Sequence, residues 1–284
     1  MLQLNLFSKL TCWKYSFQNT TSSWGEPLIM AMDVGHGYDT HVEHENFSQL
    51  EGGNRNEDKE TKAYSLIHIT EGMLFDCVDL CINEGTRTFI LGTNGCGKST
   101  LLKILAKRLS PKEGTIHHAH GLNIGYFDQH IADDLIQNAT EHMRADNKNT
   151  HKIITPLSYL KSLFPLKSEQ DLRGQLSSFG LHGNQVNTNM RYLSGGERCR
   201  LCFSILMLKS PHVLIFDEPT NHLDAESVNA LIYGIQNWNG TAVIVSHDTN
   251  FIRMVEGDCF LLVENEGKLK RIPNGIDFYL KNFF

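Results

Sequence analysis

The pattern of apolar and polar residues predicts strands that alternate with helices from about residue 64 onward. Three short apolar runs have the length of buried strands, at 88–91, 213–216 and 242–245. Two further runs are typical of edge strands, at 66–69 and 77–82. Apolar residues at helical spacing follow two of the buried strands, at 101–109 and 228–235.

These elements favour an α/β architecture. Strands joined by helices pair in parallel through right-handed crossovers, so we expect a parallel-sheet core with antiparallel edge strands. Residues from about 130 to 208 are predicted to be mainly helical and to form a separate helical lobe. The first 63 residues lack sustained periodicity, so we expect a flexible or poorly structured leader over 1–63 and a folded domain over 64–284.

Composition and charge narrow the class of protein. The net charge is −6, and residues 1–60 carry most of it, so any RNA contact must come from a local patch. The longest stretch without a charged residue, 227–247, has amide side chains near its middle, which argues against a membrane span. The seven cysteines form an odd, scattered set, which indicates a cytoplasmic protein. We interpret Cys199 and Cys202 as small residues on one helix face rather than as metal ligands.

A phosphate-binding loop follows the first buried strand. Residues 92–99 match the pattern G-x-x-x-x-G-K-[ST] between a buried strand and an amphipathic helix, which is the context that this loop requires. Backbone N–H groups of such a loop surround phosphates, while Lys98 can reach the β- and γ-phosphates and the Ser99 hydroxyl can ligate Mg²⁺. The predicted nucleotide-binding residues are Gly92, Thr93, Asn94, Gly95, Cys96, Gly97, Lys98, Ser99 and Thr100.

Polar residues follow the other two buried strands, at the edge where open α/β sheets bind ligands. Asp217 is expected to hold Mg²⁺ through water, and Glu218 to act as the general base for an attacking water. Helix capping by this acidic pair is the alternative. His247 is a candidate for contacting the γ-phosphate and that water, and a surface histidine is its alternative. Gln129 is a candidate metal and water ligand.

A second anion-binding helix start is predicted at Ser194, Gly195, Gly196 and Glu197. Since one P-loop already surrounds a triphosphate, a second phosphate site in the same chain indicates phosphate that is presented by a partner. A plain helix cap is the alternative, because serine is a good capping residue.

Together these motifs resemble an ATP-binding cassette (ABC) ATPase, and they stand in the order of that family. The run Asp217–Asp224 reads DEPTNHLD, which resembles the ABC-F subfamily, whose chains lack membrane domains and act mainly on ribosomes. Three further segments resemble the second cassette of eukaryotic ABC-F chains, at 125–130, 172–181 and 275–279. The resemblance covers roughly residues 64–284 and implies the P-loop NTPase fold of an ABC nucleotide-binding domain.

The resemblance implies a reaction and partners as well. ATP and Mg²⁺ would lie between two cassettes that face head to tail and would be hydrolysed to ADP and phosphate. The P-loop, Asp217, Glu218 and His247 of one cassette would meet the signature residues Ser194–Glu197 of the other, with Asp224 at the contact. The implied partners are a second cassette, in a homodimer or on a separate chain, and the ribosome or its rRNA.

Two features depart from the subfamily pattern. ABC-F chains usually carry two cassettes joined by a charged helical linker, whereas this chain has one. The aromatic residue that stacks on adenine is expected near residues 69–71, where this chain has Ile69, Thr70 and Glu71. Two other functions stay open at this point: the ATPase subunit of a membrane transporter, and a scaffold that binds ATP without hydrolysing it.

Overall fold

The fold is described from a computed structural model of the 284-residue chain. The structure describes residues 24–38, 72–128, 130–146, 153–221, 223–263, 267–273 and 275–283. No helix within these ranges is both long and apolar enough to span a lipid bilayer.

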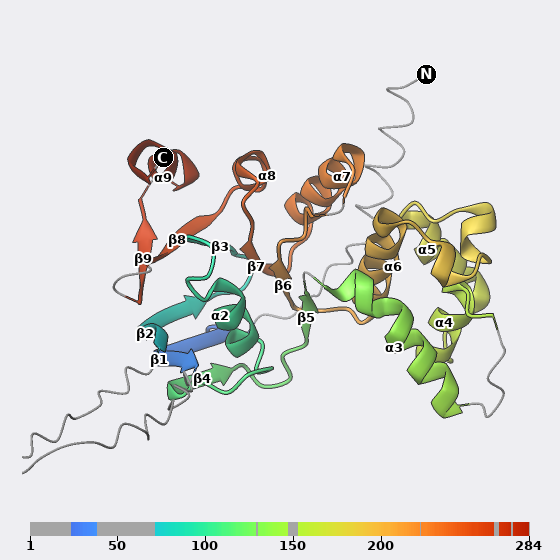
Figure 1. The fold of residues 1–284 in the computed structure, drawn as a ribbon, viewed down its shortest axis with the longest axis horizontal. Coiled ribbons are helices and arrows are strands. Elements are labelled where there is room, and N and C mark those ends of the chain that lie inside the picture. The colour runs from blue at the N-terminus through green and yellow to red at the C-terminus, as the bar shows by residue number, and fades with distance from the viewer. Residues whose placement is uncertain are drawn as a thin grey trace, which may run out of the picture.

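A mixed sheet forms the centre of the described part of the chain, with the strand order β5-β6-β7-β3-β8-β9 (Figure 1). The first five strands run parallel, and β9 pairs with β8 in the antiparallel direction. Their bounds are β3 Arg87–Leu91, β5 Ile124–Phe127, β6 Val213–Asp217, β7 Thr241–Val245, β8 Asp258–Val263 and β9 Lys268–Ile272. The predicted α/β fold with a parallel core is confirmed, and the three predicted buried strands are β3, β6 and β7.

The antiparallel strands form a sheet of their own, with the order β2-β1-β4. Their bounds are β1 Ile29–Tyr38, β2 Gly72–Ile82 and β4 Glu113–His118. The predicted edge strand at 77–82 lies within β2, whereas the one predicted at 66–69 lies outside the described residues.

Strand β1 corrects the predicted leader. It is the middle strand of the antiparallel sheet, so the interpretation of 1–63 as a poorly structured leader is wrong for residues 29–38. The strand was missed because its alternation is broken: the register shifts between Ala31 and Val34, where Asp33 adopts a positive φ of 55°. Residues 1–23 and 39–63 lie outside the described residues, and there the leader stays a prediction.

Helices α3–α6 form a lobe beside the central sheet (Figure 1). They are α3 Ile131–Asp146, α4 Pro156–Leu163, α5 Glu169–Ser178 and α6 Gly195–Leu208, with the short 3-10 helices η1 Gly183–Val186 and η2 Met190–Tyr192. Helix α2 Lys98–Leu105 follows β3, and the remaining helices lie later in the chain: α7 Ala225–Gln236, α8 Thr249–Val255 and α9 Gly275–Phe283.

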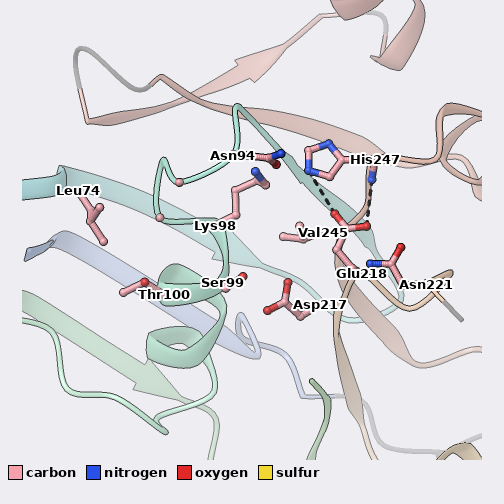
Figure 2. Close-up of a pocket in the computed structure, with 12 residues that line it drawn as sticks. Leu74, Asn94, Lys98, Ser99, Thr100, Asp217, Glu218, Asn221, Val245 and His247 are labelled. Atoms are coloured by element: carbon pink, nitrogen blue, oxygen red, sulfur yellow. Dashed lines mark hydrogen bonds and ion pairs between the residues drawn. The ribbon is translucent and has the colours of Figure 1, made fainter. Parts of the chain in front are cut away.

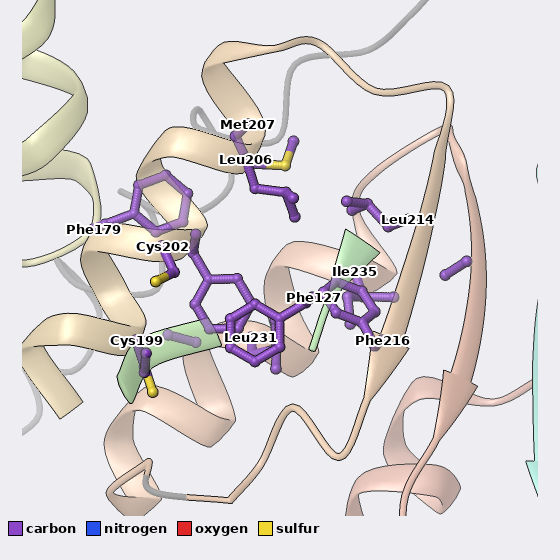
Figure 3. Packing of buried hydrophobic residues seen from close by; sticks show 14 of the residues in the cluster. Phe127, Phe179, Cys199, Cys202, Leu206, Met207, Leu214, Phe216, Leu231 and Ile235 are labelled. Carbon is purple, nitrogen blue, oxygen red and sulfur yellow. The ribbon is translucent and has the colours of Figure 1, made fainter. Parts of the chain in front are cut away.

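Alternate residues of the central strands pack into two apolar clusters, one on each face of the sheet. One cluster joins the sheet to α2, β1 and β2, and the other joins it to the helical lobe, α7 and α8. In the second cluster Phe127 stacks on Phe203, with ring centroids 4.4 Å apart, beside Phe216 (Figure 3). Cys199 and Cys202 of α6 are buried in this cluster, as expected for small residues on one helix face.

Arg87 ties the start of β3 to the end of α7. Its guanidinium donates hydrogen bonds to the carbonyl oxygens of Gly85 at 2.8 Å, Gly240 at 2.7 Å and Ile235 at 2.8 Å, and also to that of Trp238. Two of these carbonyl groups belong to the last turn of α7 and the residues just after it, where helical carbonyls lack intrahelical partners. One cation therefore satisfies several backbone acceptors from different segments.

Replacing Arg87 with alanine is expected to lower the free energy of unfolding by about 2–4 kcal/mol, because several partly buried carbonyl groups lose a charged donor. Arg271 provides the control, since its ion pair with Asp258 is exposed. Arg271→Ala is expected to cost less than about 1 kcal/mol. Denaturant titrations followed by circular dichroism measure both losses, and equal losses would contradict the role given to Arg87.

Candidate nucleotide-binding site

The phosphate-binding loop connects β3 to α2 through glycines in conformations that other residues avoid. Gly92, Gly95 and Gly97 have positive φ angles of 151°, 86° and 100°. A Cβ atom on Gly92 would lie 2.8 Å from the Cys96 sulfur, and one on Gly97 would lie 2.9 Å from the Phe75 ring. The backbone can therefore curl around an anion here only because these positions have no side chain.

Lys98 opens helix α2 and is almost fully buried, with 8% of its surface exposed. Its ammonium donates hydrogen bonds to two loop carbonyls, to Gly92 O at 2.9 Å and Thr93 O at 2.7 Å. Because an ammonium carries three donor hydrogens, these bonds hold the charge over the loop while leaving donor capacity for a further acceptor.

Asp217 ends β6 as a buried carboxylate, only 3% exposed. The Ser99 side chain hydrogen-bonds to it, while its Oδ1 atom has no hydrogen-bond partner among the described residues. Burial raises the pKa of Asp217 above its ordinary value, and the Ser99 hydrogen bond opposes this only in part. A hydroxyl beside an unsatisfied buried carboxylate oxygen is a donor set that fits Mg²⁺.

Glu218 follows in a backbone conformation that is rare for a residue with a side chain, with a positive φ of 51°. Its N–H donates to Val245 O at 3.0 Å, which fixes this turn to β7. The carboxylate accepts a hydrogen bond from the backbone N–H of His247 at 3.3 Å, and its Oε1 lies 3.5 Å from His247 Nε2 (Figure 2). Burial raises the pKa of Glu218, and His247 opposes that shift.

Most of these residues line one cavity of about 560 Å³ (Figure 2), whereas the predicted loop residues Gly92, Thr93 and Cys96 are not in its lining. The P-loop, Lys98, Ser99 and Thr100 lie on one side of it, with Asp217, Glu218 and His247 on the other. The cavity has the volume of a typical small-molecule site. The pair Asp217-Glu218 therefore faces a shared cavity with the P-loop and caps none of the described helices, while His247 is an exposed residue that lines the same cavity.

Asn221 lines this cavity and was not among the predicted site residues. A second cavity of about 540 Å³ adjoins the first, and Glu218, Asn221 and His247 line both. The sequence signal for Asn221 was its place in the run that follows Glu218. Gln129 lies outside the described residues, so its predicted role as a metal and water ligand stays a prediction.

The signature residues Ser194–Glu197 lie outside the lining of the P-loop cavity. Ser194 caps α6, and it forms a capping box with Glu197: Glu197 N donates to Ser194 Oγ at 3.3 Å, and Ser194 N donates to Glu197 Oε2 at 2.8 Å. The Ser194 hydroxyl donates to the same Oε2 at 2.9 Å. Ser194 and Gly195 are exposed, and none of Ser194–Glu197 is among the residues that line the two cavities just described.

Asp224 caps helix α7, where it accepts a hydrogen bond from Ser227 N at 2.7 Å. Arg200 of α6 reaches the same cap: its Nη1 lies 3.2 Å from Ser227 Oγ and 3.8 Å from Asp224 Oδ2. The start of α7 is thereby connected to the helix that Ser194 begins.

The aromatic residue that stacks on adenine was expected near residues 69–71, and these lie outside the described residues, so this expectation stays a prediction.

Comparison with protein families matches residues 75–221, just over half of the chain, to the family described as ABC transporter. The chain is 38% identical over 190 residues to the probable ATP-binding protein YheS of Escherichia coli, and 35% identical over 209 residues to protein GCN20 of Saccharomyces cerevisiae. It is also 36% identical over 208 residues to ATP-binding cassette sub-family F member 3 of Rattus norvegicus. These alignments cover 67%, 73% and 73% of this chain and 28%, 25% and 27% of the relatives.

Solved structures share the fold. The dimeric structure of MJ0796, a bacterial ABC transporter cassette, superposes with a TM-score of 0.59 at 20% identity and covers 86% of this chain and 97% of that one. A dimeric post-hydrolysis state of the same cassette, bound to ADP and Pi, gives a TM-score of 0.58 at 21% identity over the same shares. The chain thus has the length of about one cassette, and it spans little more than a quarter of the relatives above.

The family model matches more than half of the chain, and the relatives include a sub-family F member. The P-loop, the acidic strand end and the fold support the same family. This chain therefore belongs to the ATP-binding cassette family and is a cassette of the ABC-F type.

Proposed function

We propose that this chain binds ATP with Mg²⁺ and hydrolyses it to ADP and phosphate at an interface with a second cassette. One observation carries the proposal: Glu218, held by His247, lies on the same cavity as the P-loop. A carboxylate at this place can accept a proton from water, and the P-loop can hold the triphosphate.

The triphosphate would be bound by backbone N–H groups of residues 92–97 and by Lys98. Ser99 and Asp217 would hold Mg²⁺, because their side chains already form one hydrogen-bonded pair beside the cavity. Bound Mg²⁺ supplies charge neutralisation for the phosphate oxygens. Gln129 is proposed as a further metal and water ligand.

Glu218 is proposed to take a proton from the water that attacks the γ-phosphorus, as the bond to the leaving ADP oxygen breaks. Burial brings the pKa of Glu218 closer to neutral pH, where a general base works best. The backbone N–H of His247 holds one oxygen of this carboxylate, and His247 opposes the rise in the pKa of Glu218 that burial causes. The second cavity gives water a route to Glu218, because Glu218 lines both cavities.

A second cassette is proposed because the signature residues Ser194–Glu197 do not face this chain's own P-loop cavity. Their exposed serine and the N-terminus of α6 can receive the phosphate of a facing cassette, with Asp224 at the contact. The MJ0796 cassette of the same fold is dimeric. The facing cassette is either a second copy of this chain or a cassette on another chain.

The process is proposed to be translation, with the ribosome or its rRNA as partner, in the cytosol. This rests on the ABC-F type of the cassette. With a net charge of −6 for the whole chain, such a contact would involve a local surface rather than a basic protein as a whole.

Lys98→Ala is expected to weaken ATP binding about 10- to 100-fold, because a charge-assisted hydrogen bond contributes about 1.5–3 kcal/mol. Titration with a fluorescent ATP analogue measures the change. Lys167→Ala is the control, since Lys167 is an exposed lysine in the loop between α4 and α5 and is expected to leave binding unchanged. Unaltered affinity of Lys98→Ala would refute the P-loop assignment.

Glu218→Gln is expected to lower ATP turnover by about 10²–10⁴-fold, the usual contribution of a positioned general base, while ATP binding stays intact. With turnover blocked, a pair of cassettes should stay closed on ATP. Size-exclusion chromatography should then show an ATP-dependent dimer for a homodimer-forming chain. Turnover near that of the unmodified chain would rule out Glu218 as the base.

Glu197→Gln is expected to strengthen ATP-dependent dimerisation about two- to fivefold in the Glu218→Gln background, because a carboxylate beside Ser194 repels an approaching phosphate. Burial raises the pKa of Glu197, but hydrogen bonds from Ser194 and Gln185 and the charge of Arg200 outweigh it, so the net pKa is lowered and the charge persists. Glutamine keeps the capping box. The gain should shrink as salt rises. An unchanged or weaker dimer would show that the charge does not oppose closure.

A further inference from the structure

Two buried polar atoms on the same side of the central sheet lack hydrogen bonds within the described residues. One is the phenol oxygen of Tyr126 in β5, a residue only 3% exposed, and the other is Oδ1 of Asp217 in β6. A buried polar group without a partner lowers stability, so two such groups on neighbouring strands call for an explanation.

The strand register brings the two side chains to one face. Strands β5 and β6 are parallel neighbours in which Tyr126 pairs with Ile215. Asp217 stands two residues beyond Ile215, so it points to the same face of the sheet. Diagonal neighbours of this kind lie within reach of an aromatic side chain. This is the face that packs against α2, the helix that carries Ser99.

The electrostatic surroundings favour the protonated form of the phenol. Burial raises the pKa of Tyr126 most, and the negative charges of Asp217 and then Asp128 raise it further. The Arg108 guanidinium lies over the ring, 4.2 Å from its centroid, and holds the ring in place. A phenol is protonated at neutral pH even without this shift, so the Tyr126 hydroxyl is a hydrogen-bond donor, and it has no direct hydrogen bond to Asp217.

We propose that Tyr126 is a positioning residue for the metal site: its phenol donates a hydrogen bond to one water molecule, and that water donates to Asp217 Oδ1. The inference rests on the proposed function, because it concerns the carboxylate that would hold Mg²⁺. A buried water is stable where it has at least two polar partners, and the phenol of Tyr126 and Oδ1 of Asp217 supply two.

The proposed water would hold the Asp217 carboxylate through a second hydrogen bond. Ser99 bonds to the carboxylate, but a single hydrogen bond leaves it free to rotate about its Cβ–Cγ bond. A water held by Tyr126 fixes the other oxygen, so the carboxylate keeps one orientation toward the metal. Outer partners of this kind are worth about 10–100-fold in metal affinity.

The test is Tyr126→Phe, which removes one oxygen and keeps the ring under Arg108. We expect about tenfold weaker Mg²⁺ binding to the nucleotide complex, read from Mg²⁺ titrations of a bound fluorescent ATP analogue. Nucleotide affinity in EDTA should not change. ATP turnover should need more Mg²⁺ for half-saturation, with its maximal rate close to that of the unmodified chain.

Tyr159→Phe is the matched control, since Tyr159 is another buried tyrosine whose pKa burial raises, and it lies in the helical lobe. It should leave Mg²⁺ affinity unchanged. Equal Mg²⁺ affinity for Tyr126→Phe and the unmodified chain would overturn the proposal, as would a parallel loss of nucleotide affinity in EDTA, which indicates general damage to the site.

A second measurement does not depend on the variant's folding. In the unmodified chain with labelled tyrosines, Mg²⁺ added to the nucleotide complex should shift the ring signal of Tyr126 and leave that of Tyr159 in place. An unmoved Tyr126 signal on metal binding would overturn the proposal. Failure of the unmodified chain to bind the nucleotide at all would instead overturn the proposed function, so the two failures are distinguishable.

Discussion

The site depends on a constraint of the central sheet: parallel strands present their carboxyl ends at the same edge. Because β7 lies between β6 and β3 in the strand order, the residues that follow these three strands meet, although they are far apart in sequence. The P-loop follows β3, Asp217 ends β6 and His247 comes shortly after β7. The hydrogen bond from Glu218 N to Val245 O fastens two of these strand ends directly. The sheet thus sets the positions of these residues relative to one another, and the loops after its strands carry the side chains that line the cavity.

The same edge concentrates buried charges that the apolar core cannot screen. Desolvation favours the neutral forms of Asp217 and Glu218, whereas Lys98 and His247 favour the ionised forms. Burial outweighs the nearby positive charges, so the pKa values of both carboxyl groups are raised. Burying two carboxyl groups side by side lowers the stability of the fold. Such an arrangement is typical of sites that bind a metal ion or accept a proton. The positive φ of Glu218 is a further cost at the same point.

Motifs with a fixed backbone context were predictable from the sequence, and features set by tertiary register were not. The P-loop, the acidic strand end and the three central strands follow from local patterns, because glycine spacing and apolar runs determine them directly. Strand β1 was missed because the bulge at Asp33 breaks its alternation. Tyr126 gave no signal either, since its relation to Asp217 appears only once β5 and β6 are aligned.

The P-loop cavity and the start of α6 lie at different places in the described structure, and Arg200 links α6 to the helix after the acidic strand end. Ser194 begins α6 in the helical lobe and does not line the P-loop cavity. Arg200, on the same helix, bonds to Ser227 at the start of α7 and lies near Asp224. Because Arg200 contacts Ser227 and lies near Asp224, the position of α6 and the start of α7 are fixed relative to each other by a side chain as well as by the apolar core.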